Sequence, residues 1–103
     1  MIQFGFEPYP IEVILARDSV FSSAIVADEP WPSGVGAELR FTSVSGSPPV
    51  VWPATVTAET FSWDIPAAQV AEVLDGGAVH ARLVYVTEMG TPILWGRGRT
   101  RVA

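Results

Sequence analysis

The side chains that could support catalysis are few and scattered along the chain. The single histidine, His80, lies in an alternating segment at residues 79–83, between apolar neighbours. A Ser-His-Asp arrangement would need His80 beside a serine and either Asp64 or Asp75, yet the chain contains no G-x-S-x-G sequence of the kind that marks a nucleophile elbow. We therefore interpret His80 as a surface residue of a strand.

Carboxylates, glycines and cysteines give no stronger indication of a reaction. Asp28 and Glu29 are neighbours in a loop, and the other acids stand apart, without the D-x-D-x-D-G spacing of a calcium loop. The G-x-G pieces at residues 34–36 and 96–98 lack a following helix that would aim amides at phosphate. Zero cysteines and one histidine exclude a thiol nucleophile, a disulfide framework and a multi-histidine metal site. We expect no enzyme, no cofactor and no bound metal.

The most informative pattern is a stripe of arginines near the C-terminus. Arg97, Arg99 and Arg101 recur at every second residue, so an unbroken strand would place them on one face, with Arg82 and His80 across a hairpin. Residues 1–96 hold three arginines and eleven acids, whereas residues 97–103 hold three arginines and no acid. The stripe is either a solvated strand or a docking surface. A charge-complementary protein fits it better than nucleic acid, which an acidic domain without lysine would repel elsewhere.

The same strand poses a problem of side-chain parity. Ile93 and Trp95 would fall on the arginine face if the alternation were unbroken. A β-bulge at Gly96 or Gly98 would resolve this, because an extra residue exchanges the two faces of a strand.

Three aromatic residues outside this stripe are further docking candidates: Phe4, Tyr9 and Trp31. Residues 1–10 form either a first strand whose aromatics are core or an extended arm that reaches a neighbouring subunit. Trp31 stands between prolines in an acidic loop and is expected to be partly exposed, whereas two or three of the four tryptophans should be core. A second functional hypothesis follows, a carbohydrate- or host-surface-binding module in which Trp31 and Tyr9 stack on the ligand.

Short alternating segments make up most of the chain, and they predict an all-β domain. The 103 residues are enough for a single domain, 1–103. Strands are expected at residues 2–7, 11–16, 20–27, 37–42, 50–57, 60–65, 78–87 and 92–102. Pro53 should mark an edge strand or a bulge, because proline cannot donate to a ladder. One helix is expected at residues 66–74, where apolar residues recur at spacings of three and four before Gly76 and Gly77. We favour an antiparallel β-sandwich of seven or eight strands over a small barrel.

Composition agrees with a compact domain. The chain is 49% hydrophobic and 17% charged, which is too apolar for disorder, and its apolar runs are far shorter than the roughly 20 residues of a membrane helix. The N-terminus lacks the basic start and cleavage site of a signal peptide. The chain has no lysine and no asparagine, which suggests a GC-rich coding source.

Several segments, taken in order, resemble the LtfC-like proteins, small β-sandwich proteins of actinobacterial siphophages. The segments are WPSG at 31–34, ELRF at 38–41, WPATV at 52–56, SWDI at 62–65, VAEVL at 70–74, RLVYV at 82–86 and LWGRG at 94–98. The resemblance covers about residues 4–102, and the wider group is similar to phage tail collar and side-fibre-attachment proteins with an immunoglobulin-like sandwich.

The resemblance implies a non-enzymatic structural protein of a phage particle, made in the bacterial cytoplasm and located in the virion. Its place would be that of a minor capsid or decoration protein, a connector or a tail collar protein. Its partners would be other virion proteins, including further copies of itself in a symmetric oligomer, with neither nucleic acid nor membrane. The resemblance supplies no catalytic residues, and fold likeness alone does not determine function.

Overall fold

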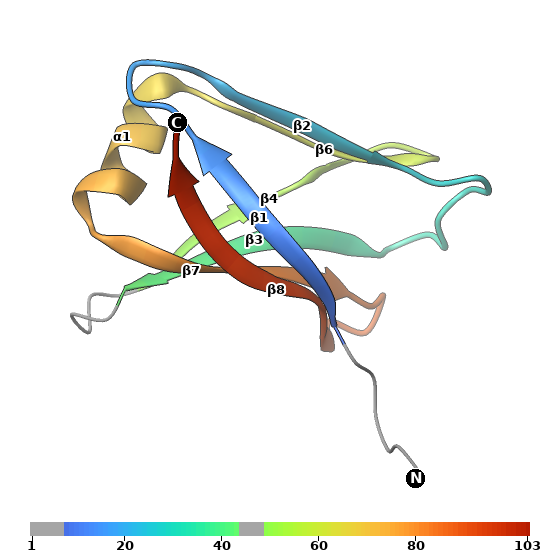
Figure 1. Ribbon diagram of the computed structural model, residues 1–103. Coiled ribbons are helices and arrows are strands. Elements are labelled where there is room, and N and C mark those ends of the chain that lie inside the picture. The colour runs from blue at the N-terminus through green and yellow to red at the C-terminus, as the bar shows by residue number, and fades with distance from the viewer. Residues whose placement is uncertain (1–7, 44–48) are drawn as a thin grey trace, which may run out of the picture.

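The computed structural model describes residues 8–43 and 49–103, which form two facing β-sheets and one short helix (Figure 1). The strands are β1 (Tyr9–Leu15), β2 (Phe21–Val26), β3 (Gly36–Ser43), β4 (Val50–Pro53), β5 (Thr55–Val56), β6 (Thr60–Ile65), β7 (Ala78–Val86) and β8 (Pro92–Val102), and the helix is α1 (Ala67–Asp75). The all-β sandwich with one helix is confirmed. The strand expected at residues 2–7, with Phe4, lies outside the described residues.

The order of the strands is that of an immunoglobulin-like sandwich. One sheet runs β1-β8-β7-β3-β4 and the other β2-β6-β5, which correspond to the GFCC′ and BED strands of that fold with an added first strand beside the last. All neighbouring strands are antiparallel except β1 and β8, which pair in parallel from Tyr9 opposite Gly96 to Leu15 opposite Val102. The expectation of a wholly antiparallel sandwich is wrong at this pair. The first and last strands are not joined by a hairpin, so no turn forces them to be antiparallel.

The predicted strand at residues 50–57 is two strands in different sheets. β4 is an edge strand that pairs with β3 alone and ends at Pro53, so the edge interpretation of this proline is right. The amide of Ala54 then donates to the carbonyl of Ala37 at 2.8 Å, and the chain crosses to pair with β6. Proline suits this crossing, because its missing amide ends the ladder without leaving an unpaired donor.

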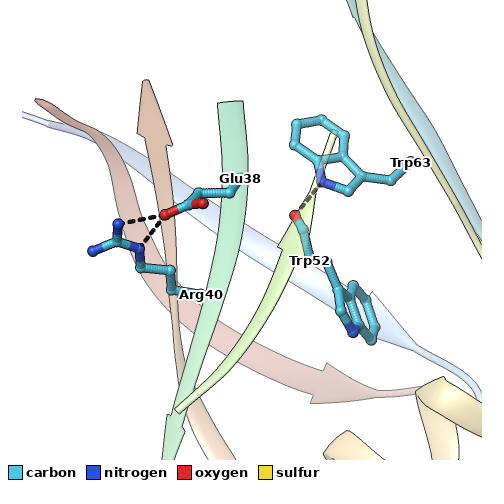
Figure 2. Close-up of polar contacts among 4 residues, drawn as sticks. All are labelled: Glu38, Arg40, Trp52 and Trp63. Carbon is cyan, nitrogen blue, oxygen red and sulfur yellow. Dashed lines mark hydrogen bonds and ion pairs between the residues drawn. The ribbon is translucent and has the colours of Figure 1, made fainter. Parts of the chain in front are cut away.

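Alternating side chains from both sheets fill the space between them. The side chains of Leu15, Phe41 and Phe61 are at most 1% exposed. Trp52 and Trp63 are each 3% exposed, and the indole Nε1 of Trp63 on β6 donates to the carbonyl of Trp52 on β4 at 2.8 Å (Figure 2). This hydrogen bond joins the two sheets inside the core, where a buried donor needs a partner.

Helix α1 covers one end of the sandwich (Figure 1). It begins after Pro66, one residue later than expected, and is anchored by Val70 and Val73, which are at most 1% exposed. Gly77 ends it with φ +72°, a conformation that glycine adopts at little cost. With nine residues, α1 is far too short to cross a membrane, and the described residues contain no longer helix.

Candidate functional site

Strand pairing gathers most of the arginines on the outer face of the five-stranded sheet. Arg82 on β7 lies directly between Arg97 on β8 and Arg40 on β3, and the neighbouring row pairs His80 with Arg99. Arg101 continues the series along β8. We call these five residues the arginine face: Arg40, Arg82, Arg97, Arg99 and Arg101. The sixth arginine of the chain, Arg17, lies elsewhere and forms an exposed ion pair with Asp75.

A β-bulge in β8 changes which side chains of this strand point outward and which point into the core. Leu83 lies opposite Gly96, but the next residue, Val84, lies opposite Leu94, so Trp95 is the extra residue. Its ring points into the sandwich and contacts Phe61 edge-on, with ring centroids 6.3 Å apart. The bulge was predicted at Gly96 or Gly98 and lies at Trp95, one residue earlier. It explains how Trp95 and the arginines belong to opposite faces of one strand.

Acidic partners are available to two of the five arginines. Glu38 accepts from the Nε of Arg40 at 2.6 Å (Figure 2), and Glu12 on β1 lies 3.1 Å from the Nε of Arg101. The other three, Arg82, Arg97 and Arg99, have no carboxylate partner among residues 8–43 and 49–103.

Like charges directly opposite one another destabilise a sheet. The arginine face holds two such pairs side by side, Arg40 with Arg82 and Arg82 with Arg97. An anionic partner would relieve this repulsion.

The unpaired arginines surround an open hollow of about 720 Å³. Its lining is Val79, His80, Arg82, Arg97, Gly98, Arg99 and Thr100. A second groove of about 450 Å³ runs between the edge strands β1 and β2 and is lined largely by apolar side chains such as Ile11, Phe21 and Ile25. The hollow is therefore the cationic site, and the groove is an apolar opening in the side of the sandwich.

Two of the other predicted docking residues, Trp31 and Tyr9, are not part of the arginine face. Trp31 is half-buried, and its ring stacks on Phe61 with centroids 4.1 Å apart and planes inclined by 8°. Its Nε1 is buried and finds no acceptor in the described part of the chain. Tyr9 is 64% exposed at the start of β1, and Phe4 lies outside the described residues. Trp31 is therefore partly exposed, as expected, with one of its ring faces covered by Phe61.

The described residues contain no grouping that resembles an active site. His80 is exposed, with no hydrogen bond to a serine or a carboxylate in the described ranges, and no three metal-ligating side chains gather there. Away from the arginine face, the pKa of Arg17 is raised because its guanidinium donates a hydrogen bond to Asp75. The arrangement of cations can bind anions by charge.

Sequence reasoning missed two features of the arginine face. Arg40 alternates with buried residues on its own strand, but its place beside Arg82 depends on the pairing of β3 with β7, forty residues along the chain. Likewise, Glu12 reaches Arg101 through the parallel pairing of β1 with β8. Neither contact can be predicted from the local sequence, because each depends on the pairing of strands that are distant along the chain.

A comparison with protein families matches residues 7–103 to a family described as LtfC-like, beta-sandwich domain. A comparison with curated protein sequences gives no match. The family match spans nearly the whole chain, including all eight strands of the two sheets.

Proposed function

The chain belongs to the LtfC-like β-sandwich family, and we propose on that premise that it is a non-enzymatic structural component of a tailed-phage virion. It occupies the head, the connector or the tail collar and is held there by contacts with other virion proteins. The observation that carries the proposal is the arginine face, in which three cations without an ion pair among the described residues surround a hollow on an otherwise acidic molecule.

Charge complementarity supports docking as the role of this surface. Complementary charges accelerate association and select partners, even where each exposed ion pair contributes little affinity. Arginine also suits such contacts because its planar guanidinium binds carboxylates with two parallel hydrogen bonds. All the cations of this chain are arginines, and five of the six are on one face.

Mass spectrometry of purified virions tests the proposal. The chain should be present in a fixed number of copies that matches the symmetry of a ring or shell. Its absence from particles would refute a structural role in the virion.

A variant tests whether the arginine face makes the contact. Replacing Arg97, Arg99 and Arg101 by serine should reduce incorporation into particles, and the difference from the wild type should be largest at low salt, because high salt also screens the charge contacts of the wild type. The matched control is Arg17→Ser, which removes an exposed arginine away from the face. Equal incorporation of both variants would assign the arginines to solvent.

A further inference from the structure

Three loops that together carry four carboxylates lie at one end of the sandwich. The loop after β2 carries Asp28 and Glu29, and the turn between β5 and β6 carries Glu59. Backbone hydrogen bonds of 2.8 Å join these two segments, from Ala27 to Glu59 and from Trp31 to Ala58. Glu88, in the β7–β8 turn, lies next to Gly34 of the first loop: a Cβ added to that glycine would lie 3.3 Å from the Cβ of Glu88.

We call these four residues the acidic end, and the loops that carry them contain no basic residue. Residues 27–35, 57–59 and 87–91 contain neither arginine nor lysine, and the four acidic residues are all exposed. No ion pair within the described residues involves any of them. The acidic end is therefore a second unpaired charged surface, opposite in sign to the first.

The two surfaces are separated along the strands. Arg82 and Arg97 are four and five residues from the β7–β8 turn, or about 14 Å or more at the usual rise per residue of a strand. That distance exceeds the Debye length of about 8 Å at physiological salt, so the charges do not neutralise each other within one molecule. A second molecule placed end to face can bring them into contact.

The shapes of the two charged surfaces are also complementary. The acidic end consists of projecting loops, whereas Arg82, Arg97 and Arg99 surround an open hollow of about 720 Å³. A hollow of this size can take a few side chains of a partner. We propose that the arginine face receives the acidic end of a second copy of this chain, so that copies associate head to tail. The proposal names the partner of the docking surface and rests in that respect on the proposed function.

The rest of the surface favours a protein over nucleic acid as the occupant. Away from the arginine face, the described residues carry eight carboxylates against the single cation Arg17. A nucleic acid seated on the hollow would extend over this acidic body and be repelled by it. A second copy presents its acidic end to the arginine face by projecting loops, and so needs no long contact with the acidic body.

Such a contact joins two different surfaces and is therefore heterologous. Each copy that docks its acidic end still offers its own arginine face, so the association repeats and produces a ring when the rotation closes. Repetition of this kind suits a protein present in many copies in a particle.

Sedimentation velocity of the purified full chain tests the proposal. Oligomers should form at about 0.01 M salt and dissociate at about 1 M salt, since the Debye length falls from about 30 Å to about 3 Å. The face variant Arg82→Ser with Arg97→Ser and the end variant Asp28→Asn with Glu29→Gln should each associate about tenfold more weakly than the wild type. Arg17→Ser and Glu72→Gln are the matched controls and should associate like the wild type.

Mixing the two variants gives the sharpest result. The face variant keeps an intact acidic end and the end variant keeps an intact arginine face, so an equal mixture should form one-to-one dimers and no larger species. Thermal unfolding of each variant, whose altered residues are all exposed, checks that the fold is intact.

Three outcomes would overturn head-to-tail docking. The wild type could remain monomeric at low salt, the mixture could fail to form dimers, or a single-stranded DNA oligonucleotide could bind the wild type and not the face variant. Each of these leaves the virion proposal to its own test, because mass spectrometry of particles does not depend on self-association in solution.

Discussion

Gly98 is the position where the fold should be least tolerant of a side chain. It lies between Arg97 and Arg99 on β8 and pairs with Ile11 on β1. A Cβ at Gly98 would lie 1.6 Å from the carbonyl oxygen of Ile11 and 2.7 Å from its carbonyl carbon. An ordinary carbon–oxygen contact needs about 3.3 Å, so the two backbones would have to separate by about 1.7 Å. A shift of that size breaks the hydrogen bonds between β1 and β8.

The cost of Gly98→Ala follows from what β1 buries. Val13 and Leu15 on this strand are 6% and 1% exposed, and full burial of such side chains contributes about 1.5–3 kcal/mol each. Displacing β1 should therefore lower the free energy of unfolding by about 3–6 kcal/mol, as an upper estimate. Domains of this size have total stabilities of roughly 5–15 kcal/mol, so the variant should be close to unfolding.

Urea denaturation followed by tryptophan fluorescence measures the loss, since Trp52 and Trp63 are buried reporters. The matched control is Gly36→Ala in the same sheet, where an added Cβ meets nothing within 4 Å. That variant should change stability by less than about 1 kcal/mol. Our reasoning is refuted if Gly98→Ala unfolds within about 1 kcal/mol of the wild type.

Two further pairs of variants test the core. Trp63→Phe removes the donor to the carbonyl of Trp52 and leaves that acceptor unpaired, so it should cost at least about 1 kcal/mol more than Trp31→Phe, which removes a buried donor that lacks an acceptor in the described residues. Chemical denaturation checks the order, and the reverse order would contradict the roles given to the two indoles. Val70→Ala should cost about 2 kcal/mol, because this helix residue is 0% exposed, whereas Val26→Ala, at a 70% exposed site, should be nearly neutral in the same assay.

The strands were predictable because their signal is local. Ala37, Leu39 and Phe41 alternate with Glu38 and Arg40 in the sequence, and the structure buries the first three and half-exposes the others. The helix was equally readable, since its apolar spacing ends at a glycine pair, and the observed bounds differ from the expected ones by a single residue. Strands and helices can be predicted from local periodicity because the positions that face the core recur at a fixed spacing and are occupied by apolar residues.

The pairing of distant strands could not be predicted from the sequence. Nothing in the sequences of β1 and β8 states that they pair, or that they do so in parallel, and the crossing at Ala54 between the sheets has the same alternating pattern as a continuous strand. The site depends on these pairings more than the core does. The stripe on β8 was visible in the sequence, but its extension by Arg40 requires the register of β3 against β7.

The bulge at Trp95 links the stability of the fold to the docking surface. Without the extra residue, the alternation that buries Trp95 against Phe61 and Tyr85 would also turn Arg97 toward the core, where an unpaired cation is strongly unfavourable. With it, one strand supplies both an aromatic core residue and the cations of the arginine face. The repulsion between Arg82 and Arg97 destabilises the sheet, and the packing of the strand against the core offsets it. A cost of this kind is expected where side chains are arranged for a partner and not for the isolated domain.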